Sequence, residues 1–409
     1  MTSDRAAGEA AASEQDGGRP VAPEPGTTAP ATTAPATTAP ATTAPATTAP
    51  AAVTLAAGTR HARPLRSRSV PVAGVAVLIA VIAVFPLVFT NPTATNFGVI
   101  TLIFVAVAAA WNIFSGFSGY LSLGHAVFYG TGAYFLVVAA KDWNLNGADV
   151  FWLLPLAGAV AALIAVPLGL VALRVRRHTF VVITIAFFFI AQLSASNLAV
   201  TGGSSGVLAP IPNWAAATFN NPFYYLAMLL AAAAVALSVL IRRSRFGLQL
   251  RAIRDDEDRA AGLGVRAMPV KLAALVLSAF ITGMAGALWV YFIGQAVPQF
   301  VFDPLFDLAV VLMVFFGGLG TIAGPVLGAL ILEPTQLYLN LQESNSYESE
   351  ILFGALFLVV ILFLPRGVLP TAGEWLTAGR IRRLRGDWFA WRAGRTADRP
   401  VPPAAGNLS

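Results

Sequence analysis

The chain has 409 residues, of which 57% are hydrophobic and 11% are charged. About a quarter of the residues of a soluble domain are charged, so this composition excludes an ordinary soluble protein. The chain has no cysteine and three histidines, which excludes disulfides and thiolate chemistry and argues against a multi-histidine metal site. Its net charge of +6 comes mostly from arginines near predicted membrane surfaces, where lipid and chain orientation explain them better than nucleic acid.

Residues 1–68 have the composition of a disordered tail rich in Thr, Pro and Ala. Four copies of Ala-Thr-Thr-Ala-Pro end at Pro50, and a proline every five residues prevents a helix. The tract is either a dispensable extension or an O-glycosylated stalk. Arginines at positions 60–68 favour the cytoplasm, where a stalk has little use. No short apolar core lies near Met1, so we expect no cleavable signal peptide.

Nine apolar segments follow, and apolar runs of about 18 residues or more indicate transmembrane helices. Backbone groups in lipid must be paired within the segment, which favours helices. The fold class predicted is therefore an all-α polytopic membrane protein with about 8–10 transmembrane helices. The segments are approximately residues 72–89, 97–114, 121–140, 151–173, 180–197, 222–241, 272–293, 305–332 and 350–365.

Arginine clusters predict the sidedness, because cytoplasmic loops are rich in Lys and Arg. Nine simple crossings would place the arginines of residues 366–392 outside the cell. If residues 303–333, interrupted by glycines, enter and return as a broken or re-entrant element, both termini are cytoplasmic. Two short full spans would restore the parity equally well. The predicted organisation is a tail (1–68), a transmembrane domain (69–370) containing a cytoplasmic loop (242–271), and a basic cytoplasmic tail (371–409).

Residues 112–134 mix glycines with polar side chains inside an otherwise apolar region. Small residues allow helices to approach closely, so tight packing is one interpretation. The other is a polar translocation path with an unwound stretch around residues 116–124. The candidate path residues are Asn112, Ser115, Gly116, Ser118, Gly119, Ser122, Gly124 and His125. His125 by itself is more typical of a hydrogen-bonded packing residue than of a ligand or proton relay.

The sequence TGGSSG at residues 201–206 lies in the long loop after the fifth of these helices. Its glycines and serines favour a flexible turn that either lines an entrance or is an ordinary connection. The candidate residues of this outer loop are Thr201, Gly202, Gly203 and Gly206.

Residues 242–271 form a charged island that contains twelve Lys, Arg, Asp and Glu residues between two apolar segments. Residues 247–263 have an apolar stripe that predicts a helix, which Gly262 and Gly264 would end. Orientation explains the arginines, but it does not require the acidic run at residues 255–258. A short helix with both charge signs and an apolar stripe is suited to docking on another protein.

The chain resembles the permease subunits of ATP-binding-cassette importers for branched-chain amino acids, and more closely the longer permease of the pair. The resemblance covers about residues 70–370. It rests on an ordered set of motifs: SGFSGYLSLGHAVFYGTGAY (115–134), TGGSSG (201–206), RSRFGLQLRAIRDDEDRAAGLGV (243–265), GGLGTIAGPVLGA (317–329) and LPRGV (364–368). The Thr/Pro-rich tail and the basic C-terminal extension are not typical of the family.

The resemblance implies a multi-pass plasma-membrane subunit without enzymatic activity, cofactor, metal or nucleic-acid partner. It also implies a homologous second permease, two cytoplasmic ATP-binding subunits and an extracytoplasmic substrate-binding protein. The chain lacks the phosphate-binding GxxxxGK[ST], so its partners must bind the ATP. The coupling loop that meets those ATPases is carried over to Arg254, Asp255, Asp256, Glu257, Ala260, Ala261 and Gly264.

Two other classes of membrane protein are alternatives to a permease subunit: an ion-coupled transporter and an intramembrane enzyme. An ion-coupled secondary transporter of small polar solutes would need acidic residues inside the membrane. Only Asp303, Asp307 and Glu333 approach the bilayer, and we expect all three at the ends of segments. An intramembrane enzyme would need a nucleophile–base pair or a metal cluster, for which one intramembrane histidine offers no partner.

Overall fold

The computed structural model describes residues 91–215 and 218–342, together with residues 83–86, 88, 351, 354, 355, 367 and 368. Contacts divide the chain into two units, Met1–Ser67 and Arg68–Ser409, and all described residues belong to the second. The predicted tails at 1–68 and 371–409 therefore lie outside the described residues, as do most of the first and last apolar segments.

The first half of the described chain is mainly α-helical and also contains one π-helix and two short 3-10 helices. In chain order its main elements are α2 (Pro92–Trp111), a π-helix (Asn112–Gly116), α3 (His125–Asp142), a 3-10 helix (Gly147–Trp152), α4 (Leu153–Ala172) and α5 (Arg177–Asn197). A further 3-10 turn covers Gly203–Ser205, and strand β1 covers Val207–Leu208.

The second half contains two long apolar helices separated by two short polar ones, and then a helical hairpin. Its elements are α6 (Asn220–Arg243), α7 (Arg245–Asp255), α8 (Glu257–Gly262), α9 (Ala267–Ile293), β2 (Gln295–Ala296), α10 (Pro298–Val301), α11 (Pro304–Gly317) and α12 (Ala323–Gln342). Strands β1 and β2 pair antiparallel, with Val207 opposite Ala296.

Helices α2, α3 and α9 form the centre of the bundle. The apolar window of α2 is 83% buried, whereas that of α5 is only 22% buried, so α5 lies at the periphery. Glycines allow the central contacts: a Cβ at Gly132 of α3 would overlap the backbone of Gly283 on α9. A Cβ at Gly286 would likewise overlap the backbone of Tyr129. Small residues thus bring α3 and α9 to backbone contact.

Six helical stretches of the described chain are long and apolar enough to cross a membrane. They overlap the predicted segments other than the first, third and last, the eighth only over its first half, and they confirm an all-α polytopic membrane protein. Helix α3 begins at His125 rather than at residue 121, because residues 119–124 are not helical. We call residues 119–124 the unwound segment. It lies within the stretch where the sequence predicts unwinding.

The predicted segment 303–333 is interrupted at its glycines, and its two halves form a helical hairpin, which a re-entrant element and two short full spans would both give. Helix α11 ends at Gly317, and the chain reverses through Gly318 and Gly320, whose φ angles are 125° and 75°. Helix α12 then runs back along α11, with Gly328 against the backbone of Met313. Glycine is needed at this turn because other residues rarely adopt positive φ.

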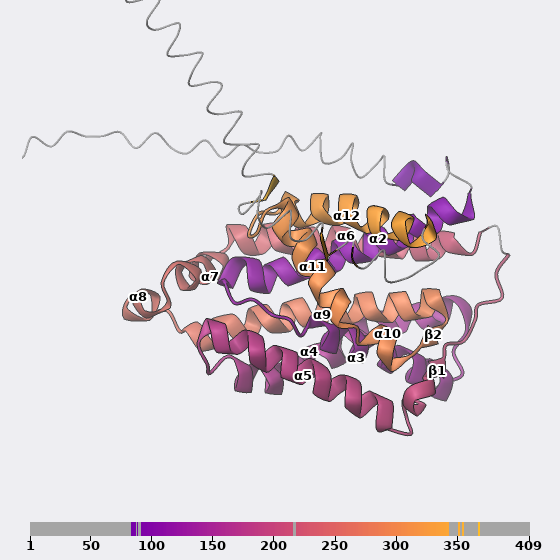
Figure 1. The fold of residues 1–409 in the computed structure, drawn as a ribbon, viewed down its shortest axis with the longest axis horizontal. Helices are drawn as coiled ribbons and strands as arrows, with labels where there is room; N and C mark the ends of the chain where they lie inside the picture. The colour runs from indigo at the N-terminus through magenta and orange to yellow at the C-terminus, as the bar shows by residue number, and fades with distance from the viewer. Residues whose placement is uncertain are drawn as a thin grey trace, which may run out of the picture. The chain divides into compact units, whose positions relative to one another are not determined.

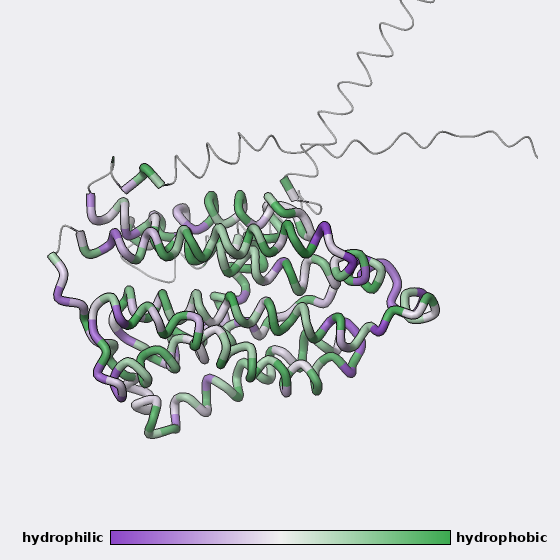
Figure 2. Tube along the Cα trace, turned by 180° about the vertical axis from the view of Figure 1, so that it is seen from behind, coloured by the Kyte–Doolittle hydropathy of each residue, from purple (hydrophilic) through white to green (hydrophobic). Residues whose placement is uncertain are grey.

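The polar short helices and the small sheet lie at opposite ends of the bundle. Figure 1 shows α7 and α8 at one end, and β1, β2 and α10 toward the other. The long helices between them are largely hydrophobic, while hydrophilic residues gather toward the ends, including the α7–α8 region (Figure 2). We call these the α8 end and the β1 end.

Candidate functional site

The coupling loop of the sequence prediction folds into two helices rather than one. Ser244 begins α7 by accepting a hydrogen bond from the Gly247 N–H at 3.2 Å. Asp256 then adopts an extended conformation (φ −159°), ends α7, and caps α8 by accepting from the Arg259 N–H at 3.0 Å. A capping aspartate stabilises a new helix start, which is why the predicted helix over 247–263 breaks here. Gly264, at φ 86°, follows the end of α8 as predicted.

The predicted coupling residues divide into an inward and an outward set. Ala260 is buried, and the Arg254 and Glu257 side chains reach other elements of the bundle. Asp255, Ala261 and Gly264 are exposed, and Asp256 is half-buried. Outside the predicted set, the exposed residues that complete the tip of α8 are Asp258, Arg259, Gly262 and Leu263.

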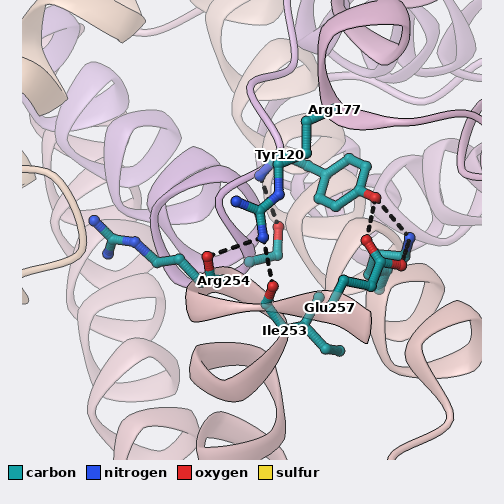
Figure 3. A network of polar contacts seen from close by, with 7 residues as sticks. Tyr120, Arg177, Ile253, Arg254 and Glu257 are labelled. Atoms are coloured by element: carbon teal, nitrogen blue, oxygen red, sulfur yellow. Dashed lines mark hydrogen bonds and ion pairs between the residues drawn. The ribbon is translucent and has the colours of Figure 1, made fainter. Parts of the chain in front are cut away.

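Glu257 is bound on both carboxylate oxygens (Figure 3). The Lys271 ammonium donates to Oε1 at 2.6 Å, and the Tyr120 hydroxyl donates to Oε2 at 2.5 Å. Lys271 also donates to the Tyr120 oxygen at 3.0 Å and lies 4.2 Å from the centre of its ring. Lys271 and Tyr120 are buried, so each polar group needs these partners. The cluster joins α8, α9 and the unwound segment.

The electrostatics of this cluster keep Glu257 charged. Burial raises the pKa of the Glu257 carboxyl, but hydrogen bonds from Lys271 and Tyr120 outweigh it and hold the pKa below its usual value. Burial and the hydrogen bond to Glu257 both raise the pKa of the Tyr120 hydroxyl. Tyr120 therefore keeps its proton and donates it to a carboxylate, which makes a strong, charge-assisted hydrogen bond.

Two arginines add further contacts around α7. Arg177, the first residue of α5, donates to the carbonyls of Ile253 at 2.6 Å and Arg254 at 2.9 Å (Figure 3). These carbonyls are at the C-terminal end of α7, where a cation is favourable. Arg254 in turn donates to the Gly116 carbonyl at 2.7 Å. The coupling loop is therefore held to α5 and to the π-helix.

Arg254 enters a junction built from glycines. Its Cγ would lie 3.0 Å from a Cβ at Gly119, whose φ is 75°, and its guanidinium occupies the place of a Cβ at Gly320. Asn112 closes the junction: its amide donates to the Thr321 carbonyl and its oxygen accepts from the Gly320 N–H, both at 2.8 Å. The π-helix thus meets the α11–α12 turn and α7 at one point. Single π-helical turns are frequent at functional sites.

The other candidate path residues hydrogen-bond inside the chain. Ser118 donates to the Phe114 carbonyl, and Ser115 accepts from the Ser122 N–H. His125 lies 3.0 Å from Ser122 Oγ and 2.8 Å from Ser278 Oγ through its two ring nitrogens. Gly124 packs against Thr184 of α5. All are buried in this chain apart from Gly119, which is half-buried, and their role in translocation stays a prediction.

Of the two buried acidic residues in the described chain, Asp307 lies at the start of its helix, as expected, whereas Glu333 does not lie at a helix end. Asp307 is buried in the first turn of α11, where it accepts from the Ala126 N–H at 3.2 and 3.4 Å and so caps α3. Glu333 is buried within α12, and its Oε2 has no hydrogen-bond partner. The expectation for Glu333 was wrong because the predicted apolar segment ends at residue 332, whereas α12 continues to Gln342.

The outer loop is ordered by backbone geometry. Gly202, Gly203 and Gly206 have φ angles of 72°, 60° and 73°, which only glycine adopts readily. Thr201 donates to the carbonyls of Ala195 and Leu198. A Cβ at Gly206 would overlap the Ala296 carbonyl, so the loop lies directly against β2. Whether a partner or a substrate uses this loop stays a prediction.

Comparison with known proteins decides the family. The family described as "Branched-chain amino acid transport system / permease component" matches residues 93–361. The chain belongs to this permease family. It is 29% identical over 329 residues to the high-affinity branched-chain amino acid transport system permease protein LivM of Escherichia coli (strain K12), covering 72% of this chain and 74% of LivM. No solved structure matches the chain.

The family also includes the shorter relative LivH. LivH of Salmonella typhimurium is 27% identical over 284 residues, which cover 65% of this chain and 91% of that protein. The greater similarity to LivM agrees with the predicted resemblance to the longer permease. As a permease with six apolar helices among its described residues, the chain is a multi-pass membrane protein of a transport class rather than an enzyme class.

Sequence reasoning missed several residues on which the site depends. Tyr120, Arg177, Lys271 and Ser278 each contact a predicted site residue from another element. Lys271 offered a signal, because a lysine at the start of an apolar segment either snorkels or finds an acidic partner. The others are common residues whose partners are distant in sequence.

Proposed function

We propose that this chain is a membrane permease subunit of an ATP-binding-cassette importer for branched-chain or related amino acids. A homologous second permease would complete the path, two cytoplasmic ATPases would power it, and an extracytoplasmic binding protein would deliver the substrate. The similarity to both LivM and LivH supports a paired permease.

One observation carries the proposal: α7 and α8 project at one end of the bundle with an open tip. Leu263 is 84% exposed, and a Cβ at Gly262 or Gly264 would meet no atom within 4 Å. A large apolar side chain surrounded by small residues and by both charge signs suits a groove on a partner. The inward residues fix this tip to the bundle, so force on the tip would reach the membrane helices. The α8 end would then be cytoplasmic.

Glu333 supports the second candidate function, an ion-coupled carrier. A buried carboxyl with one unpartnered oxygen in an apolar helix is typical of proton and ion pathways. The ABC proposal is favoured because a coupling loop with an open tip has no use in a carrier powered by an ion gradient.

Uptake into vesicles separates the two functions. The chain, its partner permease and the ATPases would be reconstituted, and uptake of labelled leucine measured with binding protein present. The importer proposal expects uptake only with ATP, unchanged by ionophores that collapse proton and sodium gradients. Uptake that follows an imposed gradient and ignores ATP would establish the carrier instead. The variant Glu333→Gln distinguishes the two functions a second time. An ion-coupled carrier would lose gradient-driven uptake when this carboxyl is removed, whereas an ATP-driven importer would keep its uptake.

A further inference from the structure

The unwound segment is the part of the membrane domain that the coupling loop holds most directly. This inference rests on the proposed function, since it concerns how ATP-driven motion reaches the path. The segment contributes Tyr120 to the Glu257–Lys271 cluster, and its first residue, Gly119, packs against Arg254. Two side chains from two different helices, α7 and α8, therefore contact consecutive residues of the unwound segment.

The cluster is built to resist separation. Its three polar groups form a closed triangle of hydrogen bonds, with Lys271 buried beneath the Tyr120 ring. Pulling α8 away would leave the buried Lys271 ammonium without its counter-charge, which is strongly unfavourable. Motion of α8 should therefore carry the unwound segment with it rather than break the contact.

The far end of the unwound segment leads into the centre of the bundle. Trp111 of α2 donates to the Ser122 carbonyl, and the Leu123 N–H donates to Thr184 of α5. The segment then becomes α3, whose first turn is held by Asp307 and whose His125 meets Ser278 of α9. A shift of the segment would change the position of the α3 N-terminus relative to α9 and α11.

We propose that the coupling loop and the unwound segment move as one body during the ATP cycle, and that Tyr120 and Lys271 are positioning residues for transport. Tyr120 transmits the displacement of Glu257 to the segment, and Lys271 keeps Glu257 turned inward. The movement of the coupling loop therefore reaches the membrane domain through the unwound segment, and not only through α6 and α9, the apolar helices that flank the loop.

The first test removes one hydroxyl. Tyr120→Phe keeps the ring and its packing, so the complete importer should assemble. Its ATP-driven uptake rate should fall about tenfold or more, the factor that a hydrogen bond to a charged group represents. The KM for leucine and the ATPase activity should remain. Tyr291→Phe is the matched control: it also removes a tyrosine hydroxyl, but one that lies outside this cluster and donates to the Gly147 carbonyl at 2.7 Å.

The second test restores the contact with a different bond. A Cβ at Gly119 would lie 3.6 Å from Cβ of Arg254, within the range of disulfides, and the chain has no cysteine of its own. Gly119→Cys/Arg254→Cys should transport slowly when reduced and recover on oxidation. Gly119→Cys alone has the same backbone strain and should not respond to oxidation.

The outcomes separate this inference from the proposed function. Normal uptake by Tyr120→Phe, or a double-cysteine variant whose uptake is not raised by oxidation, would overturn the one-body inference while leaving the importer intact. A wild-type importer without ATP-driven uptake would instead overturn the proposed function.

Discussion

Glu257 makes the most informative contact at the scale of single residues. Its motif position suggests a residue that faces a partner, yet its carboxylate turns inward to Lys271 and Tyr120. Neutralising it would leave a buried ammonium without its counter-charge. We predict that Glu257→Gln lowers the free energy of unfolding by about 1.5–3 kcal/mol at pH 7, the range for hydrogen bonds to charged groups.

The pH dependence follows from the lowered pKa of Glu257. A carboxyl whose pKa is lower in the folded state stabilises the protein above its usual pKa, near 4.3, and loses this contribution as the pH falls through the lowered value. Thermal unfolding in detergent should show a gap between wild type and Glu257→Gln at pH 7 that closes at acidic pH. Asp258→Asn, at an exposed neighbouring carboxylate, should show no such gap. A pH-independent gap would refute the ion pair's contribution.

The residues of the loop could be predicted, but their partners could not. The acidic run at residues 255–258 pointed to an interaction because orientation alone requires only arginine. Tyr120 and Arg177 lie about a hundred residues away and are ordinary members of apolar and basic stretches. Only tertiary packing brings Tyr120 and Arg177 to α7 and α8, and the local periodicity of a sequence does not predict such long-range contacts.

At the scale of elements, glycine determines how closely the helices pack. The sequence indicated close packing around residues 112–134, and the structure identifies the contact as α3 against α9. The sequence could not locate the break at Asp256, because an aspartate within a predicted helix is compatible with either a helix interior or a cap.

Gly132→Ala tests this helix contact. The added methyl would overlap the Gly283 backbone, which cannot move away as a side chain can, so we predict a loss of about 1–3 kcal/mol of stability. Gly262→Ala adds the same methyl where a Cβ meets no atom within 4 Å, and should cost nothing measurable. Equal melting temperatures for the two variants in detergent would contradict the packing.

At the scale of the whole molecule, sidedness is the property that links the site to function. The absence of native cysteine allows a direct test with single cysteines at exposed positions. Leu208→Cys, at the β1 end, should react with a membrane-impermeant maleimide in intact cells. Leu263→Cys, at the α8 end, should react only after permeabilisation. The reverse pattern would place the coupling loop on the wrong side for cytoplasmic ATPases.

The central claim is that a separate ATPase docks at the tip of α8. Leu263→Glu places a charge on that exposed tip, whereas Leu198→Glu alters another exposed leucine, at the end of α5. The decisive measurement is leucine uptake per ATP hydrolysed by the reconstituted importer. The account predicts normal coupling for wild type and Leu198→Glu, and loss of ATP-driven uptake for Leu263→Glu with the membrane domain still folded. Unchanged uptake by Leu263→Glu would contradict it.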